Sequence, residues 1–96
     1  MVFDVSKISG IGDYTVQSVK FRQVYLRGDK AFLVVHPNTI ELRCDVKLGK
    51  LLRDKYESVM ESRYFGRGGI EIVLAGNQLS ADELNDLARL SYNLTV

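Results

Sequence analysis

The sequence predicts a small α+β domain: a two-layer antiparallel five-stranded sheet with helices on one face, in the order α-β-β-β-α-β-β-α, the first helix being short or absent. Three observations support this fold class. The 96 residues are enough for one domain, residues 1–96, with a single core. Several stretches alternate apolar and polar residues between short turns, which is typical of half-buried antiparallel strands. Two further stretches place leucines at helical spacing directly after a capping residue.

The first 26 residues predict an N-terminal arm followed by one long strand. Residues 15–26 are rich in β-branched and aromatic side chains, which favour a strand. The apolar residues of this strand change parity halfway, which predicts a β-bulge near Gln23. This bulge is expected to place four apolar side chains on the core side of the sheet: Val19, Phe21, Val24 and Leu26. Before this strand, a short helical turn or an extended arm is expected from Val2, Phe3, Val5 and Ile8.

Two more strands complete a predicted three-stranded meander. A turn at residues 27–30 leads into the second strand, residues 31–36, which is apolar almost throughout. Pro37 favours a turn directly afterwards because its ring fixes φ. In the third strand, Ile40, Leu42 and Cys44 alternate with charged residues. Such short connections place consecutive strands side by side and antiparallel.

The rest of the chain predicts a helix, two strands and a closing helix. Asp45 is a good N-cap for a helix that reaches about Glu57, and its expected inner stripe is Leu48, Leu51, Leu52 and Tyr56. A short strand over residues 59–65, a glycine-rich turn at residues 66–69 and a fifth strand over residues 70–74 follow. Ser80 and Glu83 then predict the capping box of the closing helix. The expected inner face of that helix is Leu84, Leu87, Ala88, Ser91 and Leu94.

No cluster of reactive side chains predicts a catalytic or metal site, and no cofactor is expected. His36 is the single histidine and precedes a proline, so a turn residue is expected rather than one of several clustered ligands. Cys44 has the parity of a core residue; a reactive thiol would need a pKa lowered by the helix that follows. Glu41 and Glu71 lie on separate strands, and their carboxylates are expected on solvated faces. The protein is therefore not expected to be an enzyme.

Basic residues gather at the predicted hairpins, although the net charge is only +1. Any attraction for nucleic-acid phosphates must therefore come from a local patch. Residues 66–69 lack the Gly-Lys-Ser/Thr ending of a phosphate loop, so they predict a plain turn or a flexible wing. The candidate nucleic-acid-binding residues are Lys20, Arg22, Arg27, Lys30, Arg63, Tyr64, Phe65 and Arg67. The alternative is that such charges only protect strand edges from aggregation.

The chain from about residue 21 to residue 94 resembles the MmcQ/YjbR-like family of small bacterial proteins, with a shortened N-terminus. The more specific motifs are Lys30-Ala31-Phe32 in the second strand and Ser91-Tyr92-Asn93-Leu94 at the end. Residues 24–25, 40–45, 51–56 and 82–84 carry the rest of the resemblance. It implies a double-wing domain that binds DNA and has no catalytic residues. The chain departs from the family in having no tryptophan.

The expected function is that of a cytoplasmic domain that binds DNA weakly, mainly through phosphates, by two basic hairpin wings. One cysteine, no apolar run of membrane-spanning length and no signal-peptide pattern favour the cytoplasm and no membrane contact. The alternative is a protein-interaction or homodimerisation module with no nucleic-acid role, because a shortened first helix would leave sheet surface uncovered. The chain is expected to be a monomer or a weak homodimer.

Overall fold

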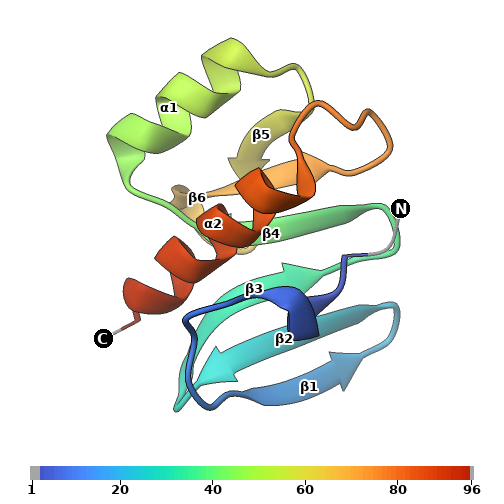
Figure 1. Cartoon of the computed structure of the whole chain (residues 1–96), viewed down its shortest axis with the longest axis vertical. Helices are drawn as coiled ribbons and strands as arrows, with labels where there is room; N and C mark the ends of the chain where they lie inside the picture. The colour runs from blue at the N-terminus through green and yellow to red at the C-terminus, as the bar shows by residue number, and fades with distance from the viewer. Residues whose placement is uncertain (1–2, 96) are drawn as a thin grey trace.

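The computed structural model describes residues 3–95 as a six-stranded antiparallel sheet with two α-helices on one face (Figure 1). Val2 of the expected N-terminal arm lies outside these residues. The order across the sheet is β1-β2-β3-β4-β6-β5. The elements are a 3-10 turn (Val5–Lys7), β1 (Thr15–Val19), β2 (Arg22–Arg27), β3 (Lys30–Val35), β4 (Thr39–Arg43), α1 (Val46–Lys55), β5 (Val59–Ser62), β6 (Gly66–Val73) and α2 (Ala81–Asn93). The α+β fold with an antiparallel sheet is confirmed, whereas the prediction of five strands is wrong.

The additional strand arises because the predicted first strand is a hairpin. The chain reverses at Lys20 and Phe21, and Lys20 adopts a φ of 54°. Two-residue hairpin turns usually place glycine or asparagine at such a position, so Lys-Phe gave no turn signal. The parity change near Gln23 reflects this reversal, and the expected bulge there is wrong. The register shift lies further along, between Tyr25 and Leu26 where β2 pairs with β3.

The main core lies between the sheet and the helices. Its fully buried side chains come from the central strands, where Phe32 and Leu33 of β3 face the helices together because of the register shift. The N-terminal segment also reaches this core, with Val5 of the 3-10 turn and with Phe3 and Ile8 on either side of the turn. The main-core residues of the central strands and the N-terminal segment are Phe3, Val5, Ile8, Phe32, Leu33, Ile40, Leu42, Ile70 and Ile72. The N-terminal segment therefore covers sheet surface that a shortened first helix was expected to leave bare.

Both helices begin at the predicted caps. The Asp45 side chain accepts hydrogen bonds from two backbone N–H groups of α1, and Ser80 and Glu83 form the complete capping box of α2. For two leucines, the predicted inward orientation is wrong. Leu51 of α1 and Leu94 at the end of α2 are exposed, because each helix presents a narrower face to the sheet than its leucine spacing suggested.

Ser91 fastens α2 to the centre of the sheet. Its hydroxyl donates to the backbone carbonyl of Phe32 and accepts from the backbone N–H of Arg43 at 2.8 Å. Phe32 and Arg43 lie just beyond Leu33 and Leu42, the last residues at which β3 and β4 pair. Without Ser91, these two backbone groups would therefore lack a hydrogen-bond partner. The adjacent Tyr92 ring packs edge-on against Phe32, with 5.0 Å between ring centroids.

The glycine-rich segment is part of β6, so its prediction as a turn is wrong. The turn between β5 and β6 consists of residues 63–65, which the sequence placed in a strand. Gly69 lies in β6 where a Cβ atom would come within 2.6 Å of both the Leu42 carbonyl oxygen and the Phe65 Cβ. Only glycine fits there without moving the backbone of β4.

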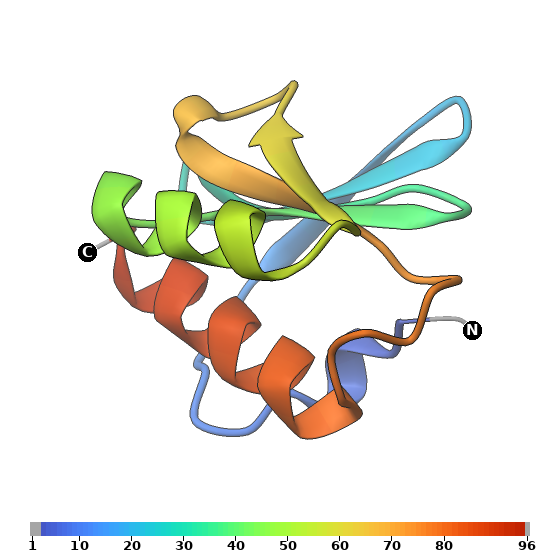
Figure 2. The ribbon, with the colours of Figure 1, turned by 90° about the horizontal axis from the view of Figure 1, so that it is seen from above.

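Two hairpins extend above the rest of the sheet, on the side away from the helices (Figure 2). We call the β1–β2 hairpin and the β5–β6 hairpin the two wings, and the sheet face between them the open face. A second, smaller apolar cluster lies on the open face and contains Val24, Ala31 and Val34, with Leu26 and Phe65 packed against it. Among residues 3–95, neither helix has the length and apolar character that a membrane span requires.

Candidate functional site

Two glutamates lie buried side by side on the open face. Glu41 of β4 and Glu71 of β6 are direct cross-strand partners and are 1% and 2% exposed. Their chain neighbours point into the core below the helices, so strand alternation directs both carboxylates to the opposite side. Like charges placed directly opposite each other in a sheet are destabilising. This carboxylate pair, Glu41 and Glu71, therefore requires strong hydrogen-bond donors around it.

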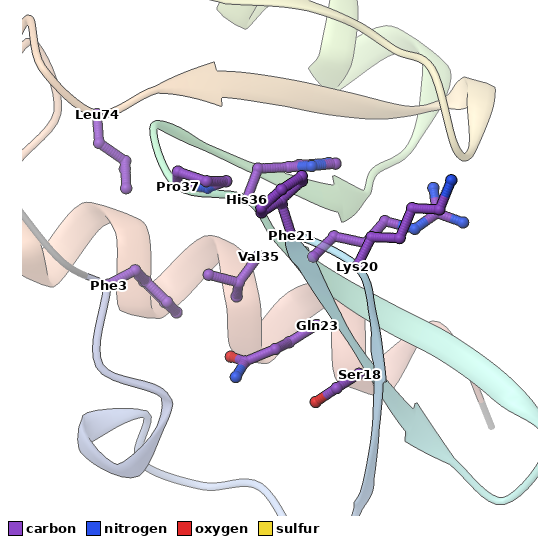
Figure 3. Close-up of a pocket in the computed structure, with 10 residues that line it drawn as sticks. Phe3, Ser18, Lys20, Phe21, Gln23, Val35, His36, Pro37 and Leu74 are labelled. Atoms are coloured by element: carbon purple, nitrogen blue, oxygen red, sulfur yellow. The ribbon is translucent and has the colours of Figure 1, made fainter.

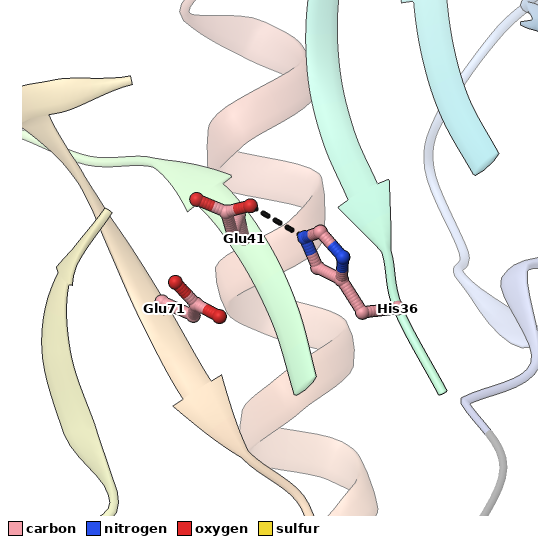
Figure 4. A group of neighbouring side chains, drawn as sticks. All are labelled: His36, Glu41 and Glu71. Atoms are coloured by element: carbon pink, nitrogen blue, oxygen red, sulfur yellow. Dashed lines mark hydrogen bonds and ion pairs between the residues drawn. The ribbon is translucent and has the colours of Figure 1, made fainter. Parts of the chain in front are cut away.

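Glu41 holds the β5–β6 turn and the β3–β4 turn against the sheet. Its carboxylate accepts hydrogen bonds from the Ser62 hydroxyl at 2.8 Å and from the backbone N–H of Tyr64 at 2.8 Å. His36 Nε2 donates to the other carboxylate oxygen at 2.6 Å (Figure 4). The Ser62 hydroxyl in turn accepts from the backbone N–H of Phe65 at 2.8 Å. The conformation of the second wing is thus set by a carboxylate on a neighbouring strand.

Glu71 also fixes the β5–β6 turn, because it binds the Arg63 guanidinium of that turn. Arg63 donates to the two oxygens of Glu71 from Nε at 2.9 Å and from Nη2 at 2.8 Å. The Thr39 hydroxyl donates to Glu71 at 2.8 Å. Such a two-pronged arginine–carboxylate contact fixes the guanidinium geometry. The Arg63 side chain still has 72% of its surface exposed, so its charge faces solvent on the open face.

The hydrogen bonds around Glu41 also determine its protonation. Burial alone would raise the pKa of this carboxyl, but the Tyr64 N–H and the hydrogen bonds from His36 and Ser62 together hold the pKa below its usual value. Glu41 is therefore an ionised acceptor at neutral pH. The ionised carboxylate accepts hydrogen bonds from all three of these groups.

The carboxylate pair and His36 also form a set of potential metal ligands. One ligand atom from each of His36, Glu41 and Glu71 lies within 4.8 Å of the others. However, the carboxylates already accept hydrogen bonds from Ser62, Tyr64 and Thr39, and the Arg63 guanidinium already supplies positive charge to Glu71. The cluster is therefore a hydrogen-bonded support for the second wing.

The burial of this pair overturns the expectation that Glu41 and Glu71 lie on solvated faces. Both strands read as apolar-Glu-apolar, a pattern that a strand with one solvent-exposed face also produces. Nothing local indicated that the second wing folds over this face. His36 does lie at the start of the β3–β4 turn, as its position before Pro37 predicted, but its imidazole also binds Glu41.

Cations and a ring from both wings meet on the open face. The Arg22 guanidinium, at the start of β2, lies 5.6 Å from the centre of the Tyr64 ring in the β5–β6 turn. Lys20 is exposed at the tip of the first wing (Figure 3), and Arg67 is exposed directly after the turn of the second. Together with Arg63, these residues bring most of the candidate nucleic-acid-binding set to the region of the two wings.

Three of the predicted site residues lie elsewhere or are covered. Arg27 and Lys30 are cross-strand partners at the far end of β2, away from Arg22. The Arg27 guanidinium lies over the Tyr92 ring of α2, 4.5 Å from the ring centre. Phe65 packs in the smaller apolar cluster beneath Arg43, whose guanidinium lies 5.0 Å from its ring centre. The sequence predicted a single strand over residues 15–26 and one turn at residues 27–30, whereas the additional turn at residues 20–21 sends the basic residues to two different ends of the sheet.

Cys44 is buried at the end of β4, as its parity predicted. Burial and the neighbouring Asp45 carboxylate raise the pKa of its thiol, and Arg53 offsets this only in part. A reactive cysteine needs the opposite shift, because the thiolate is the nucleophile.

No protein-family model, curated protein or solved structure matches this chain.

Proposed function

We propose that this chain is a non-enzymatic domain that binds nucleic acid, DNA in the first instance, along the open face between its two wings. The observation that carries the proposal is the Arg22–Tyr64 contact, which brings a cation of one wing onto a ring of the other. Lys20, Arg22, Arg63 and Arg67 would neutralise phosphates, and the partly exposed Tyr64 ring would stack on a base. Arg27 and Lys30 have no part in this interface.

The affinity is expected to be modest and dependent on salt. The overall charge of +1 provides no long-range attraction, so binding depends on the four cations near the wings. The charge of Arg63 is already partly balanced by Glu71. For four phosphate contacts, a plot of log K against log salt has a slope no steeper than about −3 for single strands.

Replacing Arg22 with alanine is expected to weaken binding and to flatten this salt dependence. Loss of one phosphate contact changes the slope by about 0.7 for single strands and about 0.9 for a duplex. Anisotropy titrations of labelled single-stranded and duplex DNA over a series of salt concentrations measure both quantities. Lys30→Ala is the matched control, because it removes one positive charge at the start of β3, beside the end of β2 that lies away from Arg22.

The wild-type protein must bind at micromolar concentration in low salt, otherwise the proposal fails. Equal slopes for Arg22→Ala and the wild type, or an equal effect of Lys30→Ala, would place the binding surface away from the open face. Variants with unchanged circular dichroism spectra are the ones to compare, so that an altered slope reports lost contacts rather than unfolding.

We also propose that the chain is a divergent relative of the MmcQ/YjbR-like family. From β2 to α2 the elements follow as three strands, a helix, two strands and a helix, which is the order that the resemblance implies. Ser91 and Tyr92 of the closing motif have a physical role in this order, because they join α2 to β3 and β4. The edge strand β1 is an addition to it.

A second candidate function is self-association through the helices. An apolar groove of about 210 Å³ lies between α1 and α2, lined mainly by Cys44, Leu48, Leu87, Leu90 and Leu94. Leu90 and Leu94 are 49% and 54% exposed. Adjoining exposed leucines of this kind often mark a protein-interaction surface.

The charge distribution of the helices fits a second copy of this chain as the partner. Within its bounds α1 has four basic residues and one acidic residue, whereas α2 has three acidic residues and one basic residue. In a two-fold symmetric pair, each patch can meet the opposite patch of the other copy. Helix α1 of one copy would then lie along α2 of the other, with the leucines between them.

Light scattering over a concentration series is expected to show a mass rising towards that of a dimer, and Leu90→Asp is expected to abolish this rise. Each substitution occurs twice in a symmetric pair, so the dissociation constant should increase at least about 100-fold. Phe21→Asp is the control, since it changes an exposed apolar side chain far from the helices in the first wing. A constant monomer mass at several hundred micromolar protein would exclude this candidate.

A further inference from the structure

A cavity of about 330 Å³ lies at the end of the sheet where the first wing meets the β3–β4 turn (Figure 3). It combines apolar and polar walls. Phe3, Phe21 and Pro37 contribute apolar surface, and Lys20, Arg22 and His36 contribute polar groups. The volume is at the small end of the range of about 300–1,000 Å³ that is typical of small-molecule pockets.

Phe21 is the most exposed large apolar side chain of this cavity wall. It has 86% of its surface accessible and lies in the two-residue turn of the first wing. The preceding Lys20 has a φ of 54°, a conformation that costs free energy for a residue with a side chain. The turn thus keeps the Phe21 ring in solvent, and the residues before and after it in the sequence, Lys20 and Arg22, are both cations.

The polar groups of the cavity can contact both parts of a nucleotide. The cations Lys20 and Arg22 flank Phe21 in sequence and suit phosphates. Nε2 of His36 donates to Glu41, which fixes that tautomer and leaves Nδ1 as a hydrogen-bond acceptor when the ring is neutral. The Gln23 side chain also lines the cavity, and its amide oxygen accepts from Tyr25 at 3.3 Å, so its NH₂ group can donate.

We propose that this cavity receives one unpaired base of a single-stranded nucleic acid, which stacks on Phe21 while Lys20 and Arg22 contact the adjoining phosphates. The inference rests on the nucleic-acid binding proposed above and adds a preference for single strands. A base inside a duplex is stacked and paired, so it reaches such a cavity only by leaving the helix. A base in a single strand has no such cost.

The Phe21→Ala variant tests the proposal. Stacking of one base on an aromatic side chain corresponds to a loss of about 5- to 150-fold in affinity on alanine substitution. That loss is expected for a labelled single strand, with no change for a duplex of the same length and no change in salt slope. Because the side chain is exposed, the variant is expected to retain the thermal midpoint of the wild type.

Phe21→Trp provides a direct signal of stacking, because the chain has no other tryptophan. Its fluorescence is expected to be quenched by a single strand, and much less by the same strand containing abasic sites, which keeps the phosphates. A free nucleoside monophosphate is the third arm: quenching by it at equal concentration would indicate a pocket for mononucleotides and contradict a strand-specific site.

The results separate this inference from the proposed function. If the wild type binds neither single strands nor duplexes, both fail. If it binds both and Phe21→Ala leaves single-strand affinity unchanged, the open-face proposal stands and the base pocket is refuted. If Phe21→Trp binds a single strand without any change in fluorescence, the base does not stack at this position.

Discussion

Replacing Glu41 with alanine is expected to lower the free energy of unfolding by about 3–5 kcal/mol, because several buried or half-buried hydrogen-bond donors lose their acceptor at once. The variant leaves the Ser62 hydroxyl and the Tyr64 N–H without an acceptor in a buried site. It also leaves Glu71 beside an empty space. For a domain with a total stability of about 5–15 kcal/mol, this is a large fraction. Urea unfolding followed by circular dichroism measures the loss.

Glu61→Ala is the control for this prediction, because Glu61 is an exposed glutamate on strand β5 of the second wing. Its free energy of unfolding is expected to stay within about 0.5 kcal/mol of the wild type. A comparably small effect of Glu41→Ala would mean that water replaces the carboxylate without cost. The network would then have no role in stabilising the second wing.

The lowered pKa of Glu41 also predicts an effect of pH with a definite sign. A carboxyl whose pKa is lower in the folded state than in the unfolded state contributes stability above its unfolded pKa, about 4.3 for glutamate. That contribution is lost as the pH falls through the lower, folded pKa. The wild type should therefore lose stability on acidification more steeply than Glu41→Gln. Asp4 and Glu83 also have lowered pKa values, and they affect both proteins equally.

Replacing Ser91 with alanine is expected to lower the free energy of unfolding by about 2–4 kcal/mol, because two buried backbone groups lose their partner. These are the carbonyl of Phe32 and the N–H of Arg43. The serine is fully buried, so water cannot take its place without rearrangement. The midpoint of urea unfolding should decrease with an unchanged dependence on urea concentration.

Asn93→Ala is the matched control, since Asn93 lies on the same turn of α2 and faces solvent. Hydrogen exchange gives a second measurement: the amide of Arg43 should exchange faster in Ser91→Ala than in the wild type. A destabilisation below about 0.5 kcal/mol would contradict the assigned role of the hydroxyl.

The two proposed functions use opposite sides of the molecule and are compatible. A symmetric pair formed through α1 and α2 would leave both open faces exposed (Figure 2). Two linked binding faces would then contact one long nucleic acid together, which raises the apparent affinity without any new contact. Leu90→Asp should in that case also weaken binding to long strands, and leave binding to short strands unchanged.

Patterns that depend on neighbouring residues were predictable. The alternation in β4, the leucine spacing in both helices and the two capping residues are local, and the α+β class and most element positions follow from them. The Lys20–Phe21 turn was not predictable in this way. Neither residue favours a hairpin turn, and the pairing of β1 with β2 and of β2 with β3 maintains it.

The candidate site also has a part that local sequence predicts and a part that only the tertiary structure determines. The sequence alone predicts Lys20, Arg22, Arg63, Tyr64 and Arg67 as cations and a ring near hairpins, and it predicts Ser91 on the inner face of the closing helix. The tertiary structure alone decides that Arg22 reaches Tyr64, that Arg27 and Lys30 lie elsewhere, and that Glu41 and Glu71 are buried. The physical reason is that these outcomes depend on strand order and on how far the second wing folds over the open face. Both are set by contacts between residues that are distant in the chain.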